Sequence, residues 1–130
     1  MPKSSQNDLT GIIIDAAVKI HSRLGPGLFE NVYEVCLAYE LRNRGLYVAR
    51  QVPISMVYDS IRFDEGFKAD LIVNDAVIIE LKSIETLLPV HKKQLLTYLK
   101  LAGKQIGHLL NFGAPLMKDG IVRVVNGLPE

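Results

Sequence analysis

The chain has few cysteines, no long apolar run and little net charge. It therefore lacks the sequence features of disulfide-bonded proteins, of membrane-spanning proteins and of proteins that attract polyanions by their overall charge. Cys36 is its one cysteine, so an internal disulfide is excluded and a reducing, cytoplasmic location is expected. No apolar run approaches the roughly 18 residues of a membrane span, and the polar residues 1–8 lack the pattern of a signal peptide. The net charge is only +1, so binding of nucleic acid would need a local basic patch.

What the chain does have is apolar residues at helical spacing. Hydrophobic residues make up 48% of its 130 residues, enough for one domain with a buried core. The spacing predicts helices over about 8–24, 28–44 and 90–102, after a lead-in at 1–7 that is predicted to be disordered. Cys36 falls on the apolar side of the second helix, which favours a small core residue over a nucleophile.

Between and after these helices the sequence predicts strands. They are expected at about 48–58 with a possible break at Pro53, briefly at 61–63, and at 67–73, 76–82, 107–112 and 121–125. Turns are expected at 59–60 and 64–66, and a loop at 113–120. Helices and strands in this order predict an α/β layered domain with a mixed sheet, in which the strand after the third helix could pair parallel with an earlier one.

The hairpin Phe67–Lys82 combines apolar strands with three charged residues. Asp70 lies between Ala69 and Leu71, and Glu80 and Lys82 follow Ile79. A strand this apolar is expected to be covered on both faces, where a charge is costly unless it is paired or binds a metal. An ion pair between Lys82 and Glu80 or Asp70 would explain these charges as well as a functional site would.

The loop of this hairpin decides whether its two acidic residues meet. A two-residue loop at Asn74-Asp75 makes the numbers of opposed residues add up to 149, which places Asp70 opposite Ile79. A three-residue loop or one bulge makes them add up to 150, which places Asp70 opposite Glu80. A functional site that uses both carboxylates therefore requires an odd loop or a bulge.

Several linked segments resemble a known family. The stretch Gly27–Tyr33 reads G-L-F-E-N-V-Y, and further matches are P-V-H at 89–91, Q-L-L-T-Y-L-K at 94–100, L-N-F at 110–112 and V-N-G-L at 125–128. Together they resemble the GxxExxY proteins, a family similar to the PD-(D/E)xK nuclease superfamily. The resemblance implies a single domain over residues 1–130 with a restriction-endonuclease-like three-layer core, a mixed β-sheet flanked by helices. Ala69 departs from it, because the superfamily motif has a proline there.

Carried over residue by residue, the resemblance implies a metal-dependent nuclease. Asp70 matches the motif aspartate, and Glu80 and Lys82 match the Glu-x-Lys pair. The implied metal ligands are Asp70, Glu80, the backbone carbonyl of Leu81 and Glu30, and the implied ion is Mg²⁺ or Mn²⁺. Gln94 matches a catalytic glutamine on the helix after the motif strand. The dipole of the second helix would account for Glu30 equally well, and Glu34 lies one turn later on a similar face.

The expected partner is nucleic acid, DNA or RNA, with a homodimer possible. The side chains expected to contact substrate are Tyr98, His91, Lys93, Tyr33 and His21. Lys92, Lys93, Lys100 and Lys104 could form a basic helix face for phosphates, or could simply be solvated, and His21 could be a boundary residue with a satisfied ring nitrogen. Two other functions stay open, a non-catalytic module that binds nucleic acid or protein, and a structural subunit.

Overall fold

The computed structural model of the protein describes residues 6–127. Its elements are α1 (Gln6–Leu24), α2 (Glu30–Asn43), β1 (Val48–Tyr58), β2 (Ile61–Val73), β3 (Val77–Lys82), α3 (Pro89–Ala102), β4 (Ile106–Asn111), the 3₁₀ turn η1 (Met117–Gly120) and β5 (Ile121–Val125). Pro89 begins α3 and Gly103 ends it at a φ of 68°, as expected for an N-terminal proline and a C-terminal glycine. Because α1 begins at Gln6, the predicted lead-in is wrong for residues 6 and 7, while residues 1–5 lie outside the described part.

The five strands form one mixed sheet with the order β1-β2-β3-β4-β5. Neighbouring strands are antiparallel except β3 and β4, which are parallel and are connected through α3. The expected parallel pairing after the third helix is confirmed. The parallel strands lie in the middle of the sheet, where residues of both are buried along nearly their whole length.

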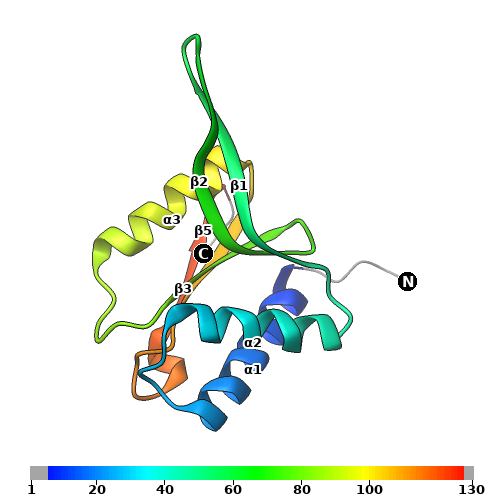
Figure 1. Cartoon of the computed structure of the whole chain (residues 1–130), viewed down its shortest axis with the longest axis vertical. Helices are drawn as coiled ribbons and strands as arrows, with labels where there is room; N and C mark the ends of the chain where they lie inside the picture. Colours follow the sequence, from blue (N-terminus) through cyan, green and yellow to red (C-terminus); the bar gives the residue numbers. More distant parts are fainter. Residues whose placement is uncertain (1–5, 128–130) are drawn as a thin grey trace.

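Helices cover both faces of this sheet (Figure 1). One buried cluster joins α1 and α2 to residues such as Leu71, Ile79 and Leu110, and the other joins α3 to residues such as Ala69 and Ile78. Alternate residues of β3 therefore belong to opposite layers, since successive side chains of a strand point to opposite faces. The expected α/β fold with a mixed sheet between helices is confirmed. None of the described helices is long and apolar enough to cross a membrane.

The loop between β2 and β3 contains three residues. The pairs Leu71↔Ile79, Ile72↔Ile78 and Val73↔Val77 give opposed residues whose numbers add up to 150. Asn74 and Asp75 have φ values of 51° and 53°, in the left-handed region that these two residue types tolerate. The condition that brings Asp70 opposite Glu80 is confirmed.

The predicted turn at 64–66 is wrong, because β2 continues through it. The register between β1 and β2 shifts between the Ile54↔Phe67 and Met56↔Phe63 pairs, as it does at a β-bulge. Gly66 fits here because an added Cβ would lie 2.6 Å from Cγ of Met56. The possible break at Pro53 does not occur either, since an edge strand tolerates proline.

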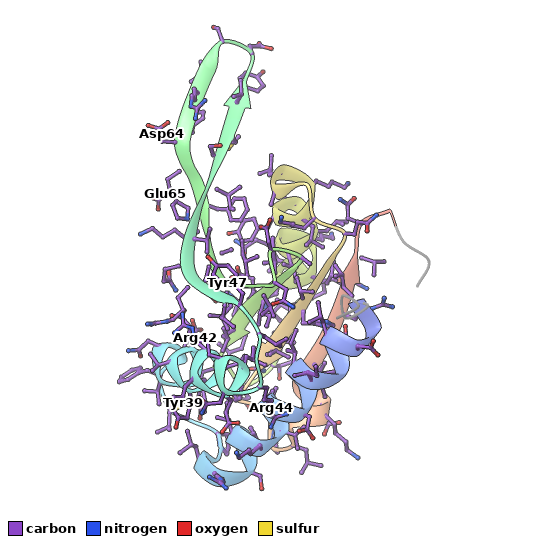
Figure 2. The ribbon with its side chains drawn as sticks, turned by 90° about the vertical axis from the view of Figure 1, so that its right-hand side faces the viewer. Tyr39, Arg42, Arg44, Tyr47, Asp64 and Glu65 are labelled. Atoms are coloured by element: carbon purple, nitrogen blue, oxygen red, sulfur yellow. The ribbon has the colours of Figure 1, made fainter. Side chains whose placement is uncertain are left out.

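The ends of β1 and β2 form an arm, residues 55–66, that projects from the body (Figure 1). Every residue of the arm except the half-buried Met56 is exposed, among them Tyr58 at 66% and Ile61 at 53%. Figure 2 shows Asp64 and Glu65 on the arm, far from Tyr39 and Arg42 on α2. The arm therefore consists of a two-stranded ribbon outside the layered core.

Candidate active site

Asp70 and Glu80 meet where the strands of the central hairpin separate. Beyond the Leu71↔Ile79 pair, side chains take the place of the backbone ladder. The Asp70 N–H donates to Oε1 of Glu80 at 3.2 Å, and the Leu81 N–H donates to Oδ2 of Asp70 at 2.9 Å. Each acidic side chain thus accepts a hydrogen bond from the opposite strand.

The side chains of β2 change faces of the sheet at the same place. Ala69 packs in the α3 layer and Leu71 in the layer of α1 and α2, although residues two apart in a regular strand share a face. In β1 the residue between Arg50 and Val52, which pair with Leu71 and Ala69, is Gln51, with a φ of 50°. This reversal leaves Asp70 between the two layers.

The surroundings of Glu80 disfavour its charge. The residue is 7% exposed, and burial together with the nearby Asp70 carboxylate raises the pKa of Glu80 to about 8. The ammonium group of Lys82, the next even-numbered residue of β3, acts in the opposite direction. A cation near both carboxylates would favour their ionised forms, so the oxygen donors of this pair fit a hard divalent ion.

Lys82 makes no ion pair with a carboxylate in the part of the chain that the structure describes. It lies half-buried at the end of β3, on the Glu80 side of the strand. A structural ion pair between Lys82 and Glu80 or Asp70 therefore does not explain the charges of this hairpin. Its ammonium group keeps its hydrogen-bonding capacity for another group.

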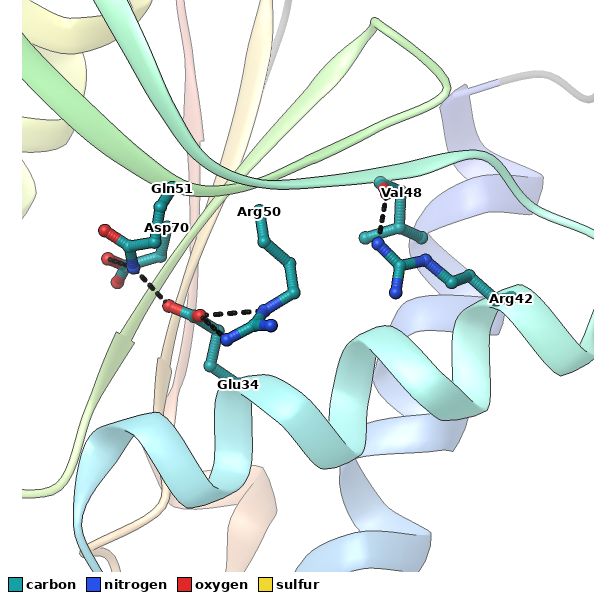
Figure 3. Close-up of polar contacts among 6 residues, drawn as sticks. All are labelled: Glu34, Arg42, Val48, Arg50, Gln51 and Asp70. Atoms are coloured by element: carbon teal, nitrogen blue, oxygen red, sulfur yellow. Dashed lines mark hydrogen bonds and ion pairs between the residues drawn. The ribbon is translucent and has the colours of Figure 1, made fainter.

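A third carboxylate, buried like that of Glu80, reaches the site from α2. Glu34, only 4% exposed, accepts hydrogen bonds from Nε and Nη2 of Arg50 at 3.0 and 2.9 Å and from Nε2 of Gln51 (Figure 3). The same Nε2 of Gln51 lies 3.4 Å from Oδ1 of Asp70. Gln51 therefore bridges two carboxylates from different elements.

The family model of the PD-(D/E)XK nuclease superfamily matches residues 7–124. The chain belongs to the PD-(D/E)XK nuclease superfamily. Comparisons with curated proteins and with solved structures give no match. Members of this superfamily generally use divalent metals, which agrees with the oxygen donors that Asp70 and Glu80 bring together.

Not every ligand that the sequence suggested joins this pair. Glu30 lies exposed at the first position of α2, in a hollow that it shares with Ser83, the residue after Lys82. Among residues 6–127 no three His, Cys, Asp or Glu side chains are placed to hold one metal ion. Asp70, Glu80 and Glu30 therefore do not form a preassembled three-carboxylate site.

Glu34 and Gln51 are site residues that were not predicted from the sequence. The position of Glu34, one helical turn after Glu30, was a signal, because residues four apart share a helix face. No pattern marked Gln51, since its role follows from its unusual φ and from its partners on α2 and β2.

The structure places Tyr33, which was predicted to contact substrate, inside the core. It is fully buried, its ring stacks on that of Phe112 at 4.4 Å, and its hydroxyl donates to the Gly25 carbonyl at 2.6 Å. It also accepts a hydrogen bond from the Leu28 N–H at 3.1 Å. Tyr33 thus fixes the turn before α2 from the inside.

The two candidate histidines hold backbone groups. Nε2 of the buried His21 donates to the Ala114 carbonyl at 2.8 Å, which agrees with a boundary residue whose ring nitrogen is satisfied. Nδ1 of His91 accepts the Leu88 N–H at 2.9 Å and caps the start of α3. Their predicted contacts with nucleic acid remain predictions.

Tyr98 is the predicted site residue of α3 that interacts electrostatically with the two carboxylates. Burial and the charges of Glu80 and Asp70 raise the pKa of Tyr98, and its ring stacks on Phe67 at 3.9 Å. Gln94 is exposed one turn earlier on the same helix face. The predicted site residues Tyr98 and Gln94 therefore lie on the helix that covers the Glu80 side of the sheet.

The predicted basic face of α3 is only partly free. Lys92, Lys93 and Lys100 are exposed. The ammonium group of Lys104, beyond the end of the helix, is bound to the carbonyl and carboxylate of Asp75 at 2.7 and 3.0 Å. Lys104 thus stabilises the hairpin loop.

The segment after Lys82 is held in place by β4. The side chain of Asn111 accepts the Ile84 N–H and donates to the Ile84 carbonyl, both at 3.0 Å. Gly113 allows this close approach, because an added Cβ would lie 2.2 Å from the Ile84 carbonyl oxygen. These contacts fix the chain that leaves the candidate site.

Proposed function

We propose that the protein is a metal-dependent nuclease of the GxxExxY group that hydrolyses phosphodiester bonds of nucleic acid. The observation that carries this proposal is the contact between Asp70 and Glu80 in the central hairpin, beside Lys82, which makes no ion pair with any of the residues that the structure describes. Membership of the PD-(D/E)XK nuclease superfamily supports the same reaction class. The unpaired Cys36 supports a reducing compartment such as the cytoplasm as the place of action.

Asp70, Glu80 and the carbonyl of Leu81 would hold Mg²⁺ or Mn²⁺, with Glu30 as a further candidate ligand. When bound, such an ion supplies charge neutralisation at the phosphate and lowers the pKa of a bound water. Burial of Glu80 supports this assignment, because a carboxyl group with a pKa near 8 needs a neighbouring cation to ionise fully at neutral pH.

The other proposed roles belong to groups of the chain itself. Lys82 orients the attacking water or helps to deprotonate it, and it stabilises charge that develops on the phosphate. Tyr98 and Gln94 hold a water or a phosphate oxygen from the α3 side. Glu34 acts as a positioning residue, because its hydrogen bond orients the Gln51 amide that reaches Asp70.

A second candidate function is a binding module that retains the nuclease fold without catalysis. The absence of a third converging metal ligand among residues 6–127 favours it, because fewer ligands bind a divalent ion less tightly. Such a module would recognise nucleic acid or a protein partner through the same surface.

Cleavage assays with purified protein test the nuclease. Single-stranded and duplex DNA and RNA are incubated with Mn²⁺ or Mg²⁺, and we expect cleavage that falls by roughly 100-fold or more in Asp70→Asn and in Lys82→Met. Asp75→Asn is the matched control, because Asp75 lies in the loop of the same hairpin but away from Glu80 and should leave cleavage unchanged.

Metal binding by calorimetry separates the two candidates. Loss of Mn²⁺ binding in Asp70→Asn together with loss of cleavage supports the nuclease. A wild-type protein that binds Mn²⁺ and nucleic acid but cleaves none of the four substrates would instead be the binding module. A wild-type protein that binds no divalent ion contradicts the metal site.

A further inference from the structure

The turn before α2 is held rigidly by side chains from two directions. Gly27 has a φ of 100°, a conformation that suits glycine. The Leu28 N–H donates to the Tyr33 hydroxyl, which itself donates to the Gly25 carbonyl, and the Ser83 hydroxyl donates to the Leu28 carbonyl at 2.5 Å. Both polar backbone groups of Leu28 are therefore satisfied by side chains, so this short turn has a fixed conformation.

The turn is also attached to the strand that carries the candidate catalytic residues. Ser83 follows Lys82 directly, so its hydrogen bond places Leu28 and Phe29 next to the end of β3. A hollow of about 520 Å³ lies there, open to solvent and lined by Gly27, Leu28, Phe29, Glu30, Asn31 and Ser83. The hollow therefore adjoins the place where Lys82 ends the strand.

Phe29 is the most exposed large apolar side chain among the residues that the structure describes. It is 83% exposed, compared with 45% for Phe63 on the projecting arm. Exposure of a phenyl ring to water is unfavourable, and a fixed turn gives the ring no route into the core. An aromatic ring that is held outward in this way is suited to stack on a flat apolar partner.

We propose that Phe29 is a stacking platform for an unpaired base, and that the substrate is therefore single-stranded nucleic acid or an unpaired end. This inference rests on the proposed nuclease function, because the base is bound next to Lys82. Bases inside a duplex are covered on both faces by their neighbours, so only an unstacked base can lie on the ring.

The chemistry of the hollow favours a base over a phosphate. Without a bound cation, the carboxylate of Glu30 in the lining would repel a phosphate group. The Asn31 amide can donate or accept a hydrogen bond at the edge of a base, and the Ser83 oxygen, whose proton goes to the Leu28 carbonyl, can accept one. The phosphate of the same nucleotide would then lie on the side of β3 that carries Lys82. The motif from Gly27 to Tyr33 thus serves to present an aromatic ring beside the site.

The variant Phe29→Trp tests this inference directly, because the chain contains no other tryptophan. It is combined with Lys82→Met to prevent cleavage and titrated with a 12-nucleotide thymidine strand, without metal. We expect quenching of the tryptophan fluorescence on binding, and no quenching by a blunt, closed DNA hairpin. Phe63→Trp in the same Lys82→Met background is the control, since its ring lies on the arm and should not respond.

Affinity gives the second measurement. In the Lys82→Met background, Phe29→Ala should weaken binding of the thymidine strand by roughly 10-fold, and Phe29→Tyr should restore it. Binding of the closed hairpin should not change. Equal effects of Phe29→Ala on both ligands, or a bound strand that does not quench Phe29→Trp, would overturn the inference.

The outcomes distinguish this inference from the proposed function. Quenching at position 29 by a strand that the wild-type protein never cleaves would retain the stacking site and contradict the nuclease. Cleavage of duplex and single strand that is equally insensitive to Phe29→Ala would retain the nuclease and contradict the stacking site. Absence of both binding and cleavage contradicts both proposals.

Discussion

The two hairpins that share β2 differ in where they place acidic and apolar side chains. The central hairpin, β2 with β3, keeps the carboxyl group of Glu80 inside the sheet, while the arm at residues 55–66 leaves Tyr58 and Ile61 in solvent. Globular proteins usually show the reverse arrangement. The two hairpins differ because of their positions in the fold. The central hairpin includes β3, the middle strand of the sheet, which lies between helix layers, whereas the arm is formed by the ends of β1 and β2 that project beyond the body.

This contrast agrees with the proposed functional site in the central hairpin. A charged carboxyl group buried in the centre of the sheet lowers the stability of the fold unless a cation or hydrogen bonds compensate for its lost hydration. The arm is different, because a two-stranded ribbon adds little stability of its own and its exposed side chains lose little when they are changed. Substitutions in the two hairpins should therefore differ in size, in pH dependence and in their effect on activity.

The largest expected effect is a stabilisation by Glu80→Gln at high pH. The folded pKa of Glu80 is about 8 and its usual value is 4.5, so the folded state binds the extra proton between these values and stability falls as pH rises through them. At about 1.4 kcal/mol per pKa unit, the variant should be more stable by up to roughly 5 kcal/mol above pH 8. Chemical denaturation at pH 5 and pH 9 without metal measures the difference.

Glu65→Gln on the arm is the matched control for this change. Glu65 is exposed and ion-paired with Lys68, so its replacement should alter stability equally at both pH values. Addition of Mg²⁺ should reduce the advantage of Glu80→Gln, because a cation stabilises the ionised carboxyl group. A stability difference that does not change between pH 5 and pH 9 would contradict the raised pKa.

Truncation of one isoleucine in each hairpin should separate core from arm. Ile79 is fully buried in β3, so Ile79→Ala should lower the free energy of unfolding by about 2 to 5 kcal/mol. Ile61 is 53% exposed near the tip of the arm, so Ile61→Ala should change it by less than about 0.5 kcal/mol. Urea denaturation measures both, and similar losses in the two variants would show that the arm packs against the body in solution.

A buried histidine outside both hairpins should produce the opposite pH dependence. His108 is fully buried in β4, where its Nε2 lies 3.1 Å from the Thr10 hydroxyl and its Nδ1 finds no hydrogen-bond partner among the residues that the structure describes. Burial together with Arg123 lowers the pKa of His108 to about 4. As the pH falls, His108 becomes protonated in the unfolded chain near pH 6.5 and in the folded protein only near pH 4. The free energy of unfolding therefore decreases as the pH falls from 6.5 towards 4.

His108→Gln should remove most of this acid sensitivity, roughly 3 kcal/mol at 1.4 kcal/mol per pKa unit. Thermal unfolding from pH 7 to pH 4 measures it, with His91→Gln as the control for a half-buried histidine that caps α3. A wild-type protein whose stability is flat over this range would contradict the assignment.

The smallest expected effect concerns the bridge between α2 and the central hairpin. Glu34→Gln keeps the shape of the side chain but loses the charge that Arg50 and Gln51 contact, so Asp70 should be oriented less well. We expect cleavage to fall by about 10-fold and Mn²⁺ affinity to weaken to a similar extent. Glu40→Gln, which breaks ion pairs elsewhere on α2, should change neither.

Among the described residues, local patterns predicted the elements well. The apolar stripes of α1, α2 and α3, the proline and glycine that bound α3, and β5 at residues 121–125 agree with the structure. These features depend on residues close together in the chain, through helical periodicity or terminal backbone preferences. The turn expected at 64–66 was wrong, because pairing with β1 overrode the turn preference of Asp64, Glu65 and Gly66.

The sequence by itself determined which residues are chemically unusual, namely Asp70, Glu80 and Lys82 in an apolar hairpin. Only the tertiary structure decided that Asp70 and Glu80 meet, because the conformation of Asn74 and Asp75 makes the loop three residues long. The tertiary structure also brings Glu34 and Gln51 to the candidate site, and it leaves Phe29 exposed to solvent near Ser83. The physical reason is that register and packing join residues distant in the chain, and local residue patterns do not encode those distances.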